Sequence, residues 1–256
     1  MLSPSAHSPQ DHPPKEASVV KQILMMSSSR KGQSAYLEHA EDQVNAVLKG
    51  RAKRVLFVPY AGGITFSFDE YESRVKPSFE RFGYELESIH RYRDARAAVE
   101  QAEAVVIGGG NTFVLLDRMY NAGIVGLLRE RLNAGMPYVG WSAGANVVCP
   151  TIRTTNDMPI VEPPTLKALG VVPFQVNPHF ISGKPAGHNG ESREERLAEY
   201  LAINPDEGVV AIPEGVALHV HGDSATVLGE FDALHFKRGG AVDKIATGST
   251  FALASI

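Results

Sequence analysis

The sequence predicts an α/β fold, with a mostly parallel sheet flanked by helices on both faces and an antiparallel extension near the C-terminus. Short, continuously apolar runs alternate with segments of helical period through the first half of the chain. Strands of that kind are buried on both faces, which is typical of parallel sheets covered by helices. From residue 217 onward, short strand-like runs are separated by glycine turns, as in antiparallel pairs.

The elements of the first half follow in order along the chain. Strands are expected at residues 23–26, 54–58, 85–89, 104–107 and 137–140, and helices at 36–48, 68–82, 94–102, 112–120 and 124–133. Asp94 is a favourable N-cap, and glycines at 50 and 83 stand just past helix ends. Pro77 predicts a kink in the second helix.

The second half begins with a long polar loop at residues 150–164, and loops of this length are usually functional. A strand is expected at 171–176 and another at 209–212. Between them, Ser192 and Glu195 form a capping-box pattern at the start of a helix over 192–202.

The length fits one large α/β domain or at most two small ones, and we expect a single domain. The 256 residues include 43% hydrophobic residues, enough for one sizeable core over residues 21–256. Residues 1–20 are rich in Pro, Ser and His and lack the apolar stretch of a signal peptide, so we expect a disordered tail.

The net charge and the cysteine content restrict the binding partners and the cellular compartment that we expect. A net charge of −4 gives no basic excess, so neither nucleic acid nor an anionic membrane is expected as a partner. No apolar run is long enough to span a bilayer. Cys149 is the single cysteine and cannot form an internal disulfide, which favours a reducing compartment, the cytoplasm.

A nucleophile candidate stands at Ser142. Residues 140–144 (GWSAG) match the pattern G-x-S-x-G, directly after a predicted strand and before a helix-compatible stretch. In a nucleophile elbow, the flanking glycines let the backbone turn sharply, so that the serine hydroxyl projects above the sheet. The alternative is a tight glycine turn that only packs a helix on a strand.

An oxyanion hole is predicted next to this serine. Residues 105–112 (VVIGGGNT) run from a strand through three glycines into a helix, and consecutive glycines can point backbone N–H groups at one anion. The N–H groups of Gly110 and Ala143 are the two candidate donors. A phosphate-binding turn lacks the required spacing here, and a purely structural turn remains the alternative.

The serine needs a base, and His179 is the preferred candidate. It follows Asn177 and Pro178 just after a predicted strand, at the carboxyl end where α/β folds place their sites. His188, in a glycine-rich loop, is the reserve. His219 and His221 share one strand face, but no third ligand stands at a suitable spacing, so no metal site is expected.

Two carboxylates compete to orient that histidine. Glu214 follows the strand at 209–212, which puts it at a strand's carboxyl end like the other candidates. Asp157 lies in the polar loop only fifteen residues after Ser142, which leaves little room for intervening sheet. We therefore prefer Glu214 as the direct partner of His179 and keep Asp157 as a second catalytic candidate.

Taken together, several segments resemble the peptidase E family, serine peptidases of family S51 that cleave α-aspartyl dipeptides. The matching segments are VVIGGGNTF, GWSAGANVVCPTIRTTNDMPIV, NPHF, GESREER and IPEG. The resemblance runs from about residue 22 into the C-terminal strands and is strongest over 104–215. Cyanophycinases look like distant relatives, and class I glutamine amidotransferases have a similar fold with cysteine as the nucleophile.

The resemblance implies roles for individual residues. Ser142 would be the nucleophile and His179 the base, and both Asp157 and Glu214 would matter for charge relay. Arg193 would pair with the aspartyl side-chain carboxylate of the substrate, because a guanidinium fork suits a carboxylate. Asn111 is a further substrate-binding candidate.

The expected activity is therefore hydrolysis of dipeptides with an N-terminal aspartate through an acyl-enzyme, without metal or organic cofactor. The alternatives are a cyanophycinase-like hydrolase, a broader esterase or peptidase of the same fold, and a ligand-binding homologue without turnover. A monomer and a homodimer are both compatible with the sequence.

Overall fold

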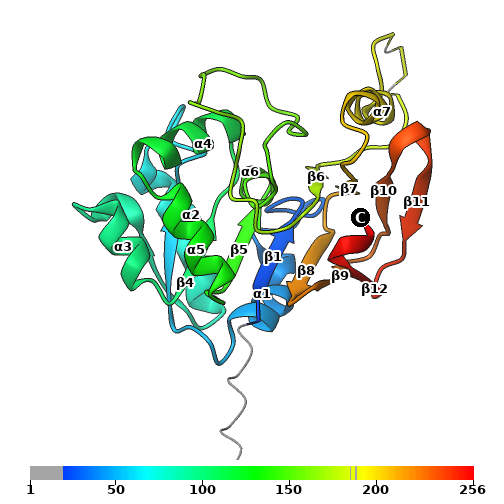
Figure 1. Cartoon of the computed structure of the whole chain (residues 1–256). Helices are drawn as coiled ribbons and strands as arrows, with labels where there is room; N and C mark the ends of the chain where they lie inside the picture. Colours follow the sequence, from blue (N-terminus) through cyan, green and yellow to red (C-terminus); the bar gives the residue numbers. More distant parts are fainter. Residues whose placement is uncertain (1–19, 185, 188) are drawn as a thin grey trace, which may run out of the picture.

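The computed structural model describes residues 20–184, 186–187 and 189–256. Residues 1–19 of the predicted tail and His188 lie outside the described residues. The chain builds an eight-stranded sheet with the order β12-β9-β8-β1-β5-β4-β2-β3 (Figure 1). Its strands are β1 (Gln22–Met26), β2 (Arg54–Val58), β3 (Glu85–Ser88), β4 (Ala104–Ile107), β5 (Tyr138–Trp141), β8 (Ala217–His221), β9 (Ser224–Leu228) and β12 (Thr250–Ala252).

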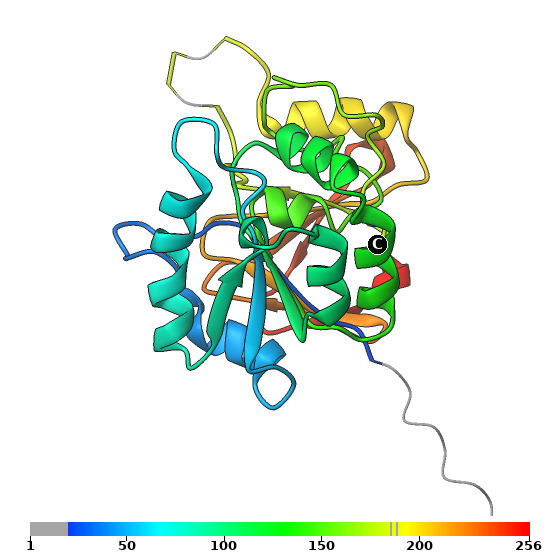
Figure 2. The same cartoon turned by 90° about the vertical axis from the view of Figure 1, so that its left-hand side faces the viewer.

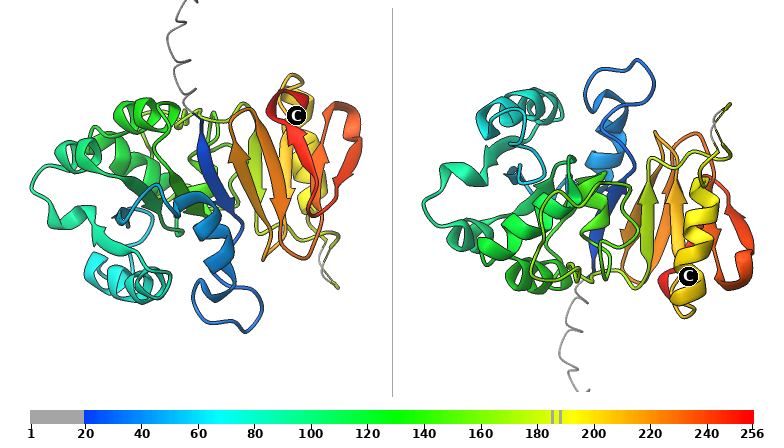
Figure 3. Two further views of the ribbon diagram at one scale, coloured as in Figure 1. Left: turned by 90° about the horizontal axis from the view of Figure 1, so that it is seen from below. Right: turned by 90° about the horizontal axis from the view of Figure 1, so that it is seen from above.

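The first five strands are parallel, as predicted, and β8, β9 and β12 extend the sheet antiparallel beyond β1. Helices cover both faces of the parallel part (Figures 2 and 3). One face carries α1 (Glu41–Leu48) and α2 (Phe68–Arg81) over one apolar cluster. The other carries α3 (Ala95–Gln101), α4 (Thr112–Asn121), α5 (Val125–Asn133) and the short α6 (Ala143–Asn146) over a second.

A separate four-stranded sheet forms the other end of the molecule, with the order β11-β10-β7-β6 (Figure 1). Its elements are β6 (Gln175–Pro178), β7 (Val209–Ile212), β10 (Ala233–Phe236) and β11 (Val242–Ile245), and α7 (Arg193–Ile203) packs on it. The C-terminal strands are thus antiparallel, as predicted, but they divide between two sheets. Strand patterns indicate burial and not the pairing partner, so the sequence did not predict this division.

Capping residues in the sequence correctly predicted where two helices begin, whereas tertiary packing determined where other elements begin and end. The Asp94 side chain caps α3, and Ser192 with Glu195 forms the capping box of α7. The strand expected at 171–176 begins only at Gln175, because the apolar residues before it are buried in turns. The second helix, α2, continues through Pro77 to Arg81.

None of the helices within the described ranges combines the length and the apolar character needed to cross a bilayer. The carboxyl ends of the parallel strands lie along one edge of the sheet. The loops that follow β1, β2, β4 and β5 begin at this edge, with Ser27, Pro59, Gly108 and Ser142 as their first residues. Ligand sites in open α/β sheets lie along this edge, which carries Gly110 and Ser142, whereas His179 and Glu214 follow β6 and β7 of the smaller sheet.

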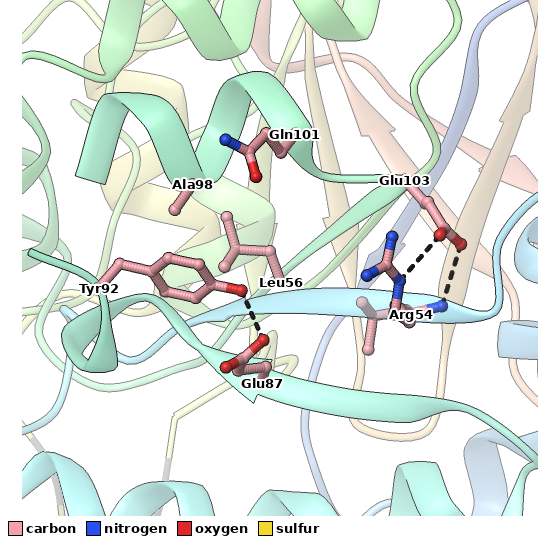
Figure 4. A pocket seen from close by; sticks show the side chains of 8 residues that line it. Arg54, Leu56, Glu87, Tyr92, Ala98, Gln101 and Glu103 are labelled. Atoms are coloured by element: carbon pink, nitrogen blue, oxygen red, sulfur yellow. Dashed lines mark hydrogen bonds and ion pairs between the residues drawn. The ribbon is translucent and has the colours of Figure 1, made fainter. Parts of the chain in front are cut away.

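At the opposite end of these strands, the carboxylate of Glu103 joins the amino ends of β2 and β4 (Figure 4). Glu103 accepts hydrogen bonds from the backbone N–H groups of Lys53 (2.8 Å) and Arg54 (3.1 Å) and from Arg54 Nε (3.0 Å). These donors favour the ionised form, with the Lys53 N–H contributing most, and lower the pKa of Glu103 to about 2.

The stabilising effect of Glu103 should therefore depend on pH. Because its pKa is lower in the folded than in the unfolded chain, its contribution is fully present above the usual pKa of 4.5. It is lost as pH falls toward about 2. We expect Glu103→Gln to lower the melting temperature at pH 7 and to differ less from wild type at pH 3. A difference that stays constant over this range would contradict the assignment.

Candidate active site

Ser142 lies on a sharp turn between β5 and α6. Its backbone angles are φ 54° and ψ −112°, a conformation that non-glycine residues rarely adopt. The neighbouring glycines are sterically required, because a Cβ on Gly144 would lie 2.2 Å from Ile107 O and one on Gly140 2.7 Å from the Gly144 backbone. The turn therefore has the strand–turn–helix form that the G-x-S-x-G pattern predicts.

His179 directly follows β6, with its ring beside the serine. Its Nε2 atom lies 3.0 Å from Ser142 Oγ. The backbone is held at φ 53° by a bond from His179 N to Ser27 Oγ (2.8 Å), and Ser27 Oγ in turn donates to Ile212 O (2.8 Å). The central strand β1 thus fixes the histidine through the residue that follows it.

Glu214 stands on the other side of the imidazole. Its Oε1 atom lies 2.9 Å from His179 Nδ1. The two side chains are 38% and 55% exposed, so this pair adds little to folding stability, and its effect is to orient the ring. A proton on Nδ1, donated to Glu214, leaves Nε2 free to accept the Ser142 hydroxyl proton.

The glycine turn after β4 lies against Ser142. A Cβ on Gly109 would be 3.0 Å from Ser142 Cβ, and one on Gly110 would be 2.2 Å from Ala61 O. Gly110 has φ 136°, which glycine alone adopts readily. In the described part of the chain, neither Gly110 N–H nor Ala143 N–H has an acceptor within hydrogen-bonding distance. Both predicted oxyanion donors are therefore available.

Asp157 binds the beginning of α4 and makes no hydrogen bond to His179 among the described residues. Its Oδ2 atom accepts from Thr112 N (2.7 Å), Thr112 Oγ1 (2.6 Å) and Thr155 Oγ1 (3.2 Å). Of the two carboxylates that the sequence left in competition, Glu214 is the one beside the imidazole. Asp157 instead connects the polar loop to the segment that follows Gly110.

Asn111 caps the same helix. Its Oδ1 accepts from Val114 N (3.1 Å), and its Nδ2 donates to Met158 O (2.8 Å). Both polar groups of the side chain thus have partners within the protein. Direct contact of Asn111 with substrate stays a prediction, and its observed contact is with the polar loop that carries Asp157.

Arg193 is the first residue of α7 and is half-buried in a polar pocket that it shares with Asp157 and Asn177. Burial, followed by the nearby charge of Arg196, lowers the pKa of the Arg193 guanidinium. Within the described residues, no carboxylate forms an ion pair with it. The carboxylate of Asp157 acts on Arg193 only from a distance. A half-buried cation without a close ion pair favours a negatively charged ligand group.

The pocket is connected to His179 through the polar loop. Asn156 Nδ2 donates to Pro178 O (2.8 Å), one residue before His179. Asn177 Nδ2 donates to Asn156 Oδ1 (2.9 Å) and to Thr154 O (2.9 Å). The long loop predicted as functional therefore forms one wall of the pocket beside β6.

Sequence reasoning missed the two serines that follow β1. Ser27 holds the backbone of His179, and Ser28 Oγ accepts from Gly215 N (3.3 Å), next to Glu214. Their signal in the sequence was a run of serines directly after a buried strand, at the edge where the other site residues gather.

A serine, an imidazole and a carboxylate in hydrogen-bonding sequence on an α/β fold define a serine hydrolase. Comparison with known sequences specifies the class further. The sequence profile of peptidase family S51 matches residues 23–228, and the chain belongs to this family of serine peptidases.

Curated relatives match nearly the full described length. The chain is 50% identical over 233 residues to peptidase E of Actinobacillus pleuropneumoniae serotype 5b (strain L20), covering 91% of this chain and 99% of the relative. It is 48% identical to peptidase E of Pasteurella multocida (strain Pm70) with the same coverage.

Among solved structures, a peptidase from an acI-B1 Actinobacterium superposes with a TM-score of 0.66 at 18% identity. The match covers 91% of this chain and 97% of that one. At this identity the match supports the fold and not the substrate.

Proposed function

We propose that the protein is a dipeptidase that hydrolyses dipeptides with an N-terminal aspartate. The observation that carries the proposal is the hydrogen-bonded series Ser142, His179 and Glu214, at 3.0 and 2.9 Å. Relatives named peptidase E, 48–50% identical over 91% of the chain, support this substrate class.

The free thiol of Cys149 is buried, and we expect the enzyme to act in the cytoplasm.

The reaction follows from the positions of the groups. Ser142 Oγ attacks the carbonyl carbon of the aspartyl residue while His179 Nε2 takes its proton. The N–H groups of Gly110 and Ala143 stabilise the oxyanion of the tetrahedral intermediate. His179 then gives the proton to the leaving amine, and Glu214 stabilises the imidazolium between these steps. Water, deprotonated by His179, releases aspartate from the acyl-enzyme.

Arg193 supplies the preference for aspartate in this proposal. Its half-buried guanidinium would bind the side-chain carboxylate of the substrate in the pocket that it shares with Asn177, two residues before His179. Asp157 and Asn111 hold the polar loop against the start of α4, so they shape the pocket and the turn that carries Gly110.

A substrate panel tests the proposal. Purified protein should hydrolyse Asp-Leu in the presence of EDTA, and should act more slowly on Asn-Leu and Leu-Leu. A preference for Leu-Leu or for simple esters would instead support a broader esterase or peptidase. A protein that neither cleaves the panel nor labels at Ser142 with a fluorophosphonate would be a binding homologue.

Arg193→Ala should impair Asp-Leu cleavage selectively. Losing a charge-assisted contact of about 1.5–3 kcal/mol corresponds to a fall in kcat/KM of roughly 10- to 100-fold. Activity on Leu-Leu should change little. Lys49→Ala removes one exposed positive charge elsewhere and serves as the matched control. Equal losses on both substrates would assign Arg193 to folding rather than to substrate recognition.

A further inference from the structure

A buried tyrosine lies beneath the glycine turn of the site. Tyr71, in the second turn of α2, is 4% exposed, and its hydroxyl donates a hydrogen bond to Gly109 O at 2.7 Å. No sequence pattern connects residue 71 with the turn, because the two meet only through packing of α2 on the sheet.

The ring of Tyr71 is fixed in place from several sides. Phe57 and Phe66 contact it edge to face, with ring centroids 5.1 and 5.4 Å away. Glycine is required at two neighbours, since a Cβ on Gly62 would lie 2.6 Å from Tyr71 Cδ1, and one on Gly108 2.3 Å from the hydroxyl oxygen. The hydroxyl is therefore presented to Gly109 in a single direction.

That direction matters because of peptide geometry. The carbonyl of Gly109 and the N–H of Gly110 belong to one planar trans unit and point in opposite directions. Glycine on both sides of this peptide would allow it to rotate, since glycine tolerates both signs of φ. A hydrogen bond that holds the carbonyl on one side therefore holds the N–H on the other.

We infer that Tyr71 is a positioning residue for the oxyanion hole: by holding the Gly109 carbonyl, it keeps the Gly110 N–H directed at the position of the tetrahedral oxyanion. The inference rests on the proposed function, since it presumes Gly110 as a donor. Burial raises the pKa of Tyr71 well above its usual 10, so its hydroxyl keeps its proton and stays a donor at neutral pH.

Tyr71→Phe tests the inference, with Tyr84→Phe as the matched control. Tyr84 is also buried under the same face of the sheet, at 6% exposure, and its hydroxyl bonds to Asn45 Oδ1 (2.6 Å), away from the glycine turn. Removing the Tyr71 hydroxyl should lower kcat for Asp-Leu roughly 10- to 100-fold, part of the 10²- to 10³-fold effect of losing a whole oxyanion donor. KM should stay within about threefold, because the turn is needed in the transition state rather than for binding.

The control should lose a comparable amount of thermal stability and keep kcat within about twofold. Equal kcat for the two variants, or a rise in KM alone for Tyr71→Phe, would overturn the inference. If Tyr71→Phe does not fold, Phe66→Leu keeps the hydroxyl but loosens its ring, and it should lower kcat several-fold. An unchanged kcat in that variant would also overturn the inference.

A second readout separates this inference from the dipeptidase proposal. A fluorophosphonate places its phosphoryl oxygen where the oxyanion forms, so the labelling rate of Ser142 also depends on the Gly110 N–H. Tyr71→Phe should slow labelling roughly tenfold or more relative to Tyr84→Phe. This ratio decides the role of Tyr71 even if wild type labels and fails to cleave Asp-Leu, a result that would remove only the substrate assignment. Equal labelling rates would overturn the inference.

Discussion

Ser142→Ala is expected to reduce kcat for Asp-Leu by roughly 10⁴-fold or more, the largest effect of any single substitution in this protein. Without the hydroxyl no acyl-enzyme can form, and only the oxyanion donors and substrate binding remain. Release of free leucine, followed by chromatography, measures the loss directly. Fluorophosphonate labelling should disappear in the same variant.

The Ser142→Ala protein should keep its fold, because alanine removes one oxygen and leaves the turn otherwise unchanged. Ser73→Ala is a suitable control, since Ser73 is an exposed residue of α2 whose hydroxyl bonds only within its own helix. It should retain wild-type activity. Residual turnover above about 1% in Ser142→Ala, with contamination excluded, would refute nucleophilic catalysis at this position.

Glu214→Gln is expected to produce the second large loss, about 10³-fold in kcat. A neutral amide no longer stabilises the imidazolium, and it can hold the ring in the wrong tautomer. Loss of a buried acid in this role costs about 10⁴-fold. A smaller figure is expected here because the Glu214 side chain is 55% exposed and water can partly replace it.

Asp157→Asn should differ from Glu214→Gln in its effects on stability and on labelling of Ser142. Asp157 contacts Thr112 at the start of α4, so the substitution should lower stability by about 1 kcal/mol and weaken kcat/KM for aspartyl substrates. Labelling of Ser142, which does not need the Arg193 pocket, should remain close to the wild-type rate, whereas Glu214→Gln should slow it. The reverse result would make Asp157 the functional partner of His179.

The parts of the structure that local chemistry determines were predictable from the sequence. The bounds of the strands 54–58, 104–107 and 209–212 were predicted residue for residue, because each is continuously apolar and bounded by turn residues. Ser142 and His179 were predicted as candidates because each stands directly after a strand. The two strands belong to different sheets, and the packing of these sheets brings the two side chains to 3.0 Å, which the sequence did not predict.

The parts that depend on distant contacts were not predictable in the same way. The sequence favoured Glu214 over Asp157 only because Glu214 follows a strand, and it did not predict that Asp157 binds Thr112 at the start of α4. The division of the C-terminal strands between two sheets depends on pairing partners. Tyr71 reads as an ordinary apolar position of an amphipathic helix, and only its hydroxyl contact with Gly109 distinguishes it.

Three non-glycine residues in the described chain have positive φ, and two of them are Ser142 and His179. Each such conformation costs about 1–3 kcal/mol, which glycine at the same position would largely avoid. Selecting variants for heat resistance alone would therefore favour substitutions that remove the positive φ angle at these two residues, and such variants would lose activity. A more heat-stable variant that stays active must therefore gain its stability at other positions and keep the positive φ angles of Ser142 and His179.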